Sequence, residues 1–192
     1  MTSIWKEEVN TGLCNELLSN VKYKGKNNKL VPVDLVLVRV PEEEFKPEKF
    51  PCVSIYSLDD VFSTQRYNPS PRIKSIDKPS HSATMQEAGL PFNLRYQIDF
   101  WSKYQEDMDN MTMTWLSGHF RQFNLPVMND RGNKTTCNCL MNGKVVTSDL
   151  ISGSERIFHK IFRYTIWVEI DQEKTYNTNI VTDVNVSAYK KD

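Results

Sequence analysis

Residues 93–123 constrain the fold most strongly, because their hydrophobic period changes from two to about 3.6 within one segment. The first part alternates apolar Leu94, Tyr96, Ile98 and Phe100 with Arg95, Gln97, Asp99 and Trp101. This alternation predicts a half-buried strand. The apolar side chains that follow recur every three or four positions: Tyr104, Met108, Met111, Trp115, His119 and Phe123, with Leu116 and Phe120 beside them. They predict a helix lying across the strand's sheet, with Ser102 and Gln105 as a capping box at its start.

The N-terminal half predicts one more helix and two more strands. A helix beginning after Ser3 would carry a stripe formed by Trp5, Val9, Leu13, Leu17 and Val21. Gly25 lies in the polar stretch that ends it. Residues 30–40 are rich in Val and Leu and predict an interior strand that Pro41 ends. Residues 52–56 predict a short strand that pairs with it.

The second half predicts mainly antiparallel strands. Residues 125–128 and 135–141 predict a hairpin, and Asn142-Gly143 a further tight turn into residues 144–146, so that this region would form a small meander. Residues 152–154 precede a final long strand. One face of that strand would carry Phe158, Phe162, Tyr164, Ile166, Val168 and Ile170.

Two segments lack a clear period. Residues 58–89 contain Pro69, Pro71 and Pro79 and predict an extended loop insertion, either a partner-binding segment or a tolerated insertion. This loop carries the basic residues Arg66, Arg72, Lys74 and Lys78, but its aromatics, Phe62 and Tyr67, are too few for a base-stacking platform. The tail, residues 171–192, is polar, although Ile180, Thr182, Val184 and Val186 alternate. It would be frayed, or would add a strand to a neighbouring subunit.

Length and charge bound the class of protein. The 192 residues suit a single α+β domain over residues 1–170, with a mixed, mainly antiparallel sheet and an N-terminal and a central helix packed on it. Lys plus Arg equal Asp plus Glu at 24 each, so no global field attracts nucleic acid or an anionic membrane. No apolar run reaches the roughly 18 residues needed to span a bilayer. We therefore expect an unsecreted protein without membrane contact.

The residues able to carry chemistry are scattered. Cys14, Cys52, Cys137 and Cys139 are expected to be reduced, and Cys137 and Cys139 share a strand face without the further ligands of a metal site. The histidines, His81, His119 and His159, are isolated, and His119 is expected at the boundary of its helix. Asp59 with Asp60, and the Glu42, Glu43, Glu44 run, are expected to be solvated or capping groups. The sequence therefore predicts no catalytic, cofactor-binding or metal site and no enzyme.

The order of these elements resembles the tail-terminator, or tail-completion, proteins of tailed bacteriophages. The resemblance covers roughly residues 3–170 and is carried by "LPFNLRYQIDFW" and "RIFHKIFRYTIWVEI", the latter ending in the aromatic strand "FRYTIWVEI". It is a resemblance of pattern and not of a signature motif. Residues 58–89 and the tail after Asp171 exceed the minimal pattern.

This resemblance implies a structural virion protein without catalytic residues. Such proteins form a ring, usually a hexamer, on the last ring of the tail tube, where they stop its polymerisation and join tail to head. Implied partners are further copies of the chain, the tail-tube protein, head–tail connector or neck proteins and the tail sheath, with DNA only passing through the lumen. Assembly would occur in the bacterial cytoplasm. The alternatives are another neck or connector component, a nucleic-acid-binding module using residues 66–78, and a hydrolase with a site assembled from distant loops.

Overall fold

The structure is a computed structural model. In it, β7 (Leu90–Ser102) and α2 (Gln105–His119) form the strand-to-helix unit that the sequence predicts. The structure describes residues 5–25, 27–39, 47–77, 79–80, 82–129, 132–143, 145–152, 155–172 and 175–179. The remaining elements are α1 (Lys6–Asn20), β1 (Lys22–Lys24), β2 (Leu30–Pro32), β3 (Val36–Val38), β4 (Cys52–Phe62), β5 (Arg72–Asp77), β6 (Ser82–Gln86), β8 (Gln122–Met128), β9 (Lys134–Met141), β10 (Val146–Ser152), β11 (Glu155–Ile170) and β12 (Thr175–Asn179). The α+β class, with two helices and mainly antiparallel sheets, is confirmed.

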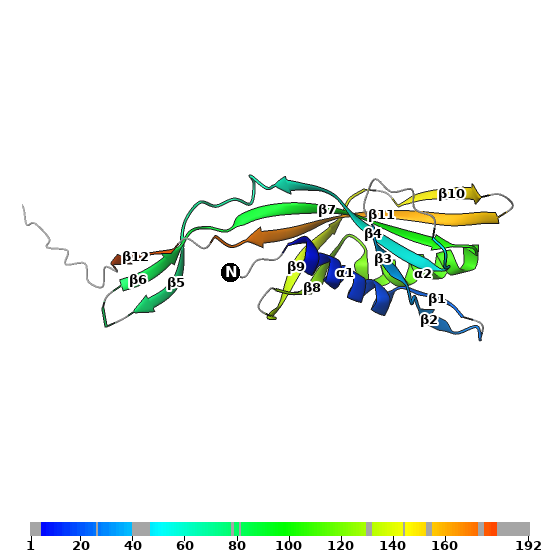
Figure 1. Cartoon of the computed structure of the whole chain (residues 1–192), viewed down its shortest axis with the longest axis horizontal. Helices are drawn as coiled ribbons and strands as arrows, with labels where there is room; N and C mark the ends of the chain where they lie inside the picture. The colour runs from blue at the N-terminus through cyan, green and yellow to red at the C-terminus, as the bar shows by residue number, and fades with distance from the viewer. Residues whose placement is uncertain are drawn as a thin grey trace, which may run out of the picture.

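One large sheet contains seven strands. Its order is β3-β4-β7-β11-β9-β8, with β10 also paired to β11. Among its described strands, only the β3–β4 pair is parallel. Both helices lie on one side of this sheet, α1 mainly against β8 and α2 against β1, β7 and β11 (Figure 1). We call this sheet, with its helices and the β1–β2 hairpin, the body.

The core lies between the helices and the sheet. The predicted inward residues of β7 are all fully buried: Leu94, Tyr96, Ile98 and Phe100. On α1, Val9, Leu13 and Leu17 are also fully buried, and on α2 so are Met111 and Trp115. α1 approaches β8 closely at Gly12, where a Cβ would lie 2.8 Å from the Pro126 carbonyl oxygen. Only glycine allows that approach without a shift of the backbone.

The ends of α2 differ from the prediction. Ser102 exchanges hydrogen bonds with the backbone of Tyr104 and does not cap the helix, so the capping box is wrong. Tyr104 is the N-cap residue and is exposed. The helix ends at His119, and Arg121 takes a left-handed φ of 67° that turns the chain into β8. Phe123, predicted on the helix, is therefore a buried residue of β8.

The predicted strand over residues 30–40 is also wrong in extent. It is divided into β2, which pairs with β1 in a separate two-stranded sheet, and β3, which is an edge strand of the large sheet. Val33, between the two, is buried and donates its N–H to the Val21 carbonyl, which continues the β1–β2 register by one residue pair before the chain passes to β3. The expected pairing of this region with the next strand is confirmed by β3 and β4. Residues 40–46, with the three glutamates, lie outside the described residues.

The predicted hairpin of β8 and β9 is confirmed, but the meander is wrong. β10 pairs with β11 and not with β9. β9 reaches β11 at Tyr164–Trp167 and β10 covers Glu155–Ile161, so the two occupy successive parts of the same edge. The face of β11 is as predicted, with Phe162, Tyr164, Ile166 and Val168 buried.

Residues 58–89 are not a loop, which corrects the sequence prediction. β4 continues to Phe62, opposite Phe92, and β5 and β6 then form a three-stranded sheet with β12, in the order β12-β6-β5. Pro69, Pro71 and Pro79 fall between strands, where they remove no ladder hydrogen bond. The polar residues 175–179 of the tail add a strand to their own chain. This sheet, here called the arm sheet, extends from the body at the ends of β7 and β11 (Figure 1).

Candidate functional site

A buried polar cluster lies on the face of the large sheet opposite the helices. Its centre is Asp99 of β7, whose side chain is 1% exposed. Arg39 Nη2 donates to Asp99 Oδ2 at 2.9 Å, and Gln97 Nε2 donates to Asp99 Oδ1 at 2.8 Å. His159 Nε2 lies 3.3 Å from the same Oδ1 atom. The expectation that Gln97, Asp99 and Trp101 lie on an exposed face is therefore wrong.

The geometry of this cluster holds strands together. Strand register places Ser54 of β4 opposite Asp99, and His159 of β11 opposite Trp101. The His159 ring stacks on Trp101 at 3.8 Å between centroids, and Trp101 Nε1 donates to Ser54 Oγ at 3.0 Å. The cluster thus joins β4, β7 and β11 through side chains, together with Arg39, which directly follows β3. A nucleophilic triad would need its base between the hydroxyl and the carboxylate, and here the Ser54 hydroxyl accepts from an indole instead.

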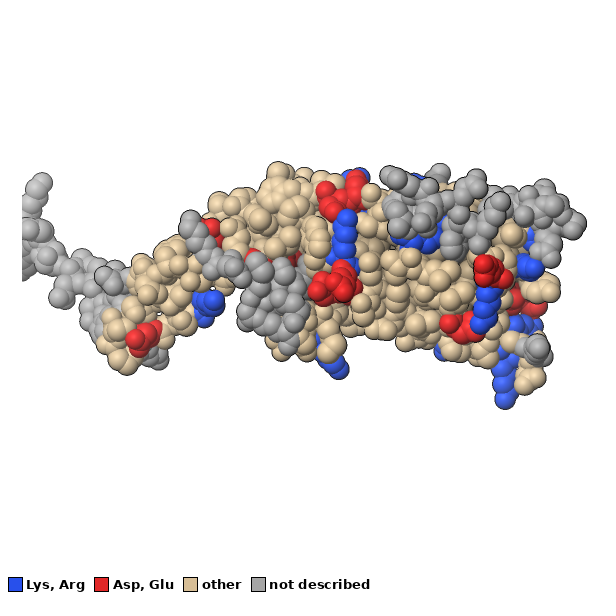
Figure 2. All heavy atoms as spheres, viewed as in Figure 1, with Lys and Arg blue, Asp and Glu red and all other residues tan. Residues whose placement is uncertain are grey.

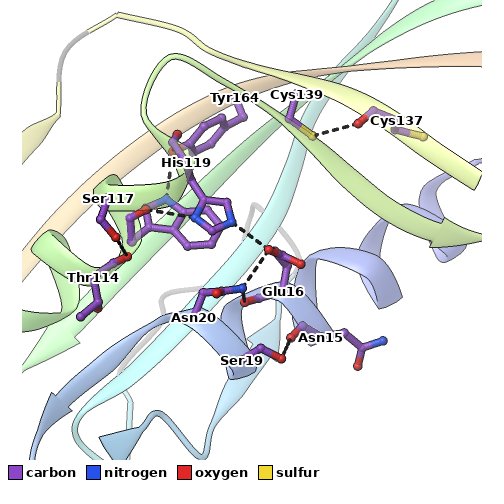
Figure 3. A network of polar contacts seen from close by, with 11 residues as sticks. Asn15, Glu16, Ser19, Asn20, Thr114, Ser117, His119, Cys137, Cys139 and Tyr164 are labelled. Carbon is purple, nitrogen blue, oxygen red and sulfur yellow. Dashed lines mark hydrogen bonds and ion pairs between the residues drawn. The ribbon is translucent and has the colours of Figure 1, made fainter. Parts of the chain in front are cut away.

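His119, the second histidine of the sequence analysis, is the last residue of α2 and is buried, whereas the sequence predicted only a boundary residue of that helix (Figure 3). Its Nε2 is 2.9 Å from Glu16 Oε1 on α1, and its Nδ1 is 3.0 Å from the Trp115 carbonyl oxygen. The ring stacks on Trp115 at 3.7 Å. Tyr164 Oη accepts from Trp115 Nε1 at 2.9 Å and donates to the His119 carbonyl at 3.2 Å. His119 therefore links the two helices. His81 lies outside the described residues.

The cysteines are free thiols in protected places. Cys137 and Cys139 share the core face of β9, as predicted. Burial raises the pKa of Cys137 to about 11 and that of Cys139 further. Since the thiolate is the form that binds metals, burial opposes ligation at this pair. In the described residues, His, Cys, Asp and Glu do not gather in a group of three able to hold a metal ion.

The carboxylates of β4 are engaged in ion pairs. Asp59 Oδ2 accepts from Arg95 Nη1 at 3.1 Å, and Asp60 Oδ2 lies 2.7 Å from Lys6 Nζ. Asp59 and Arg95 line an open groove of about 740 Å³ that also includes Asn142 and Arg163. The two aspartates are thus paired with separate cations, and each holds a different neighbour against β4.

The described basic residues of 66–78 do not form a patch for nucleic acid. Arg66 Nη2 donates to the Phe92 carbonyl at 2.5 Å and to Asn93 Oδ1 at 2.8 Å, and partial burial lowers the pKa of its guanidinium. Arg72 Nη2 lies 2.7 Å from Glu169 Oε1. Lys78 lies outside the described residues, and Lys74 is exposed. On the side shown in Figure 2, basic side chains of the described residues lie beside acidic ones and form no continuous stripe.

The arm sheet has one apolar and one polar face. Strand register places Ile73, Met85 and Tyr176 in one row and Ile76, Ala83 and Thr178 in the next. An irregularity between Ile73 and Ser75 brings both isoleucines to this side. The opposite face carries Arg72, Ser75, Asp77, Ser82, Thr84 and Gln86. Ile73 is 61% exposed, Ile76 55% and Tyr176 44%, so the apolar face of the arm sheet is the candidate interaction surface.

Comparison with known proteins gives a distant structural neighbour. No family model matches the chain, and no curated protein matches it. One solved structure that the comparison finds is the sheath/tube terminator of the PVC extracellular contractile injection system in its extended state, at a TM-score of 0.47 and 12% sequence identity. The match covers 100% of this chain and 65% of that chain, so this chain spans about two thirds of the neighbour's length.

Among the described residues, neither helix is long and apolar enough to cross a bilayer.

Proposed function

We propose that this chain is a structural protein of a phage-like tail that forms a ring on the end of the tail tube, stops tube growth and joins the tail to the head. The observation that carries the proposal is the arm sheet. It projects from the body (Figure 1), and its apolar side chains Ile73, Ile76 and Tyr176 are exposed in the isolated chain. Such a surface is typical of proteins that assemble with others.

The arm sheet contributes little to the stability of a single chain. The hydrophobic core consists of body residues on α1, α2, β4, β7, β8, β9 and β11, with Val21 and Val33 beside them, and includes no described residue of β5, β6 or β12. On its apolar face Ala83 is buried, but the larger side chains of Ile73 and Ile76 are exposed and gain free energy of burial only when another molecule covers them. In a ring, the arm sheet would reach an adjacent copy or the tube.

The resemblance of the element order to phage tail terminators supplies the class. It implies a hexameric ring, with the tail-tube protein on one side, head–tail connector or neck proteins on the other, and the sheath outside. DNA would only pass through the lumen. The proposed role involves no catalysis and no cofactor, and the protein would be found at the neck of the virion. Another neck or connector component would use the same arm with different neighbours.

The nucleic-acid alternative receives no support from the arm. Arg66 and Arg72 are held by Phe92, Asn93 and Glu169 of the same chain. Phosphate binding would first have to break these contacts. If DNA binding were the function, affinity would fall steeply with salt, because released counterions drive such binding.

The test is a tube-growth assay with the tail-tube protein of the same particle. Tube protein alone should form tubes of variable length, and adding the chain should shorten them and place sixfold rings at their ends in electron micrographs. Cryo-electron microscopy of intact particles should place the same ring at the head-to-tail joint. Density along the tube wall, or at the distal end of the tail, would refute the proposal.

A further inference from the structure

We propose that residues 180–186 of one copy add as a strand to the free edge of β5 in a neighbouring copy. The proposal rests on the proposed function only in requiring that copies lie side by side. It assigns a specific donor and acceptor within the chain.

The acceptor is the outer edge of the arm sheet. β5 pairs with β6 on one side only, and no other described strand lies on its second side. All six of its residues are exposed. An open edge offers unpaired backbone N–H and C=O groups, which a further strand satisfies. Ile73 and Ile76 would at the same time contact side chains of the added strand.

The donor follows directly on β12. Residues 180–186, Ile-Val-Thr-Asp-Val-Asn-Val, contain four β-branched apolar residues and no proline or glycine. This composition favours an extended strand. Ile180, Thr182, Val184 and Val186 have the same parity as Tyr176, which lies on the apolar face of the arm sheet. The donor thus has an apolar side to place beside Ile73 and Ile76.

Residues 180–186 are poorly suited to folding back on their own chain. β12 ends at Asn179, opposite Ser82, at the tip of the arm sheet where β5 also ends, at Asp77. Returning along β12 would need a tight turn at Ile180 and Val181, but β-branched residues disfavour the positive φ of such turns. Reaching its own β5 edge would mean crossing about three strand spacings, roughly 14 Å, and would use about four residues of the segment.

Residues 180–192 are long enough to leave the arm sheet of their own chain and contact another copy. The 13 residues from 180 to 192 can extend about 43 Å beyond the tip at roughly 3.3 Å per residue. The adjacent copies of a ring present identical arm sheets, so each tail finds the same acceptor. The contact would then repeat around the ring, so that residues 180–186 of every copy pair with β5 of the next copy.

The first experiment measures binding of a labelled peptide, residues 180–192, to a chain that ends at Asn179. We expect saturable binding, weakened about tenfold by Val184→Pro, which removes a ladder hydrogen bond. Ala188→Pro is the matched control, since it lies outside the donor, and should bind like the unmodified peptide. Absence of peptide binding to the folded truncated chain would overturn the proposal.

The second experiment uses full-length chains and does not depend on the truncated one. Chains carrying Ile73→Cys or Ile76→Cys are mixed under oxidising conditions with chains carrying Val184→Cys. We expect a disulfide joining two different chains for at least one acceptor position, and none when Leu18→Cys, on the exposed face of α1, replaces it. A chain carrying both Ile73→Cys and Val184→Cys is oxidised separately. A disulfide within that chain, with none between the singly substituted chains, would show that the tail folds back and would overturn the proposal.

The two proposals fail separately. Rings at the tube end that form without peptide binding or cross-linking would refute strand addition and leave the ring intact. Peptide binding and cross-linking without any effect on tube length would support strand addition and count against the tail-terminator role.

Discussion

Single residues of the core combine apolar burial with polar contacts. Tyr164 and Trp115 are fully buried, and each carries a polar group that must find a partner. They meet these needs together, since Tyr164 Oη accepts from the Trp115 indole and donates to the His119 carbonyl (Figure 3). Burial accordingly raises the pKa of Tyr164 far above its ordinary value. The hydroxyl therefore stays protonated and continues to donate at neutral pH.

We expect Tyr164→Phe to destabilise the protein by about 1–3 kcal/mol, because it leaves the buried Trp115 indole N–H without an acceptor. Tyr96→Phe is the matched control. Tyr96 is equally buried, but its hydroxyl lies 3.5 Å from the Lys6 carbonyl, too far for a strong hydrogen bond. Urea denaturation measures both variants. Equal losses in the free energy of unfolding would mean that the Trp115–Tyr164 hydrogen bond stabilises the protein no more than the Tyr96 hydroxyl does.

Two methionines on α2 test which face of the helix is buried. Met111 is fully buried, whereas Met113, two positions on, is 69% exposed. Met111→Ala should cost about 2–5 kcal/mol through lost burial and a residual cavity. Met113→Ala should stay within about 0.5 kcal/mol of the parent. Thermal or urea unfolding gives both values. A larger loss of stability for Met113→Ala than for Met111→Ala would mean that Met113, and not Met111, faces the core.

The cysteines should differ in reactivity. Burial raises the pKa of Cys52 to about 12 and that of Cys137 to about 11, so at pH 7–8 their thiolate fractions are small. Cys14 is only half-buried, and its pKa is raised by the same cause. Native protein treated with iodoacetamide should label first at Cys14, and unfolded protein at all four cysteines. Mass spectrometry of the peptides distinguishes them, and rapid native labelling of Cys139 would contradict the packing of β9.

At the scale of elements, sequence patterns identified the parts that bury a face. β7, α2, β11 and the β8–β9 hairpin were predictable because their apolar residues recur at the period of the element. β5 was missed because all of its residues are exposed, so it has no buried face to mark it. The polar cluster at Asp99 was missed because its partners Arg39 and His159 are 60 positions away on either side. No local pattern reports contacts of that kind.

Arg66 should act as a structural residue at the root of the arm. Its guanidinium holds Phe92 and Asn93 at the start of β7 and lies 5.3 Å from the Trp167 ring centroid. Arg66→Ala should therefore cost about 1–3 kcal/mol. Lys74→Ala, which removes an exposed charge from the same segment, should leave stability almost unchanged. If Arg66→Ala unfolds like the parent protein, Arg66 does not stabilise the fold, and its charge is available to a partner.

For the whole molecule, we expect the body to fold without the arm. Ser63 N–H donates to the Pro91 carbonyl at 2.9 Å, so residues 64–90 can be replaced by Asn-Gly as a tight turn, with the chain ended at Asp171. The shortened chain should unfold cooperatively but fail to cap tubes or join heads to tails. A version lacking only residues 180–192 separates the tail from the arm sheet. If the shortened chain does not fold, the body depends on the arm and this prediction is wrong. If the shortened chain still joins heads to tails, the arm is a tolerated insertion.

The continuity of β7 and β11 has a mechanical consequence. Both strands run without interruption from the middle of the body to the base of the arm, paired from Leu90–Ile170 to Ser102–Phe158. Tension along the arm would therefore pull β7 and β11 in the same direction, along the strand axes, and the hydrogen-bond ladders that join β11 to β9 and β10 would carry the load in shear. Peeling, which breaks such bonds one after another, would require a sideways force. A contact made through this arm would thus resist strain along the strand axes better than strain across them.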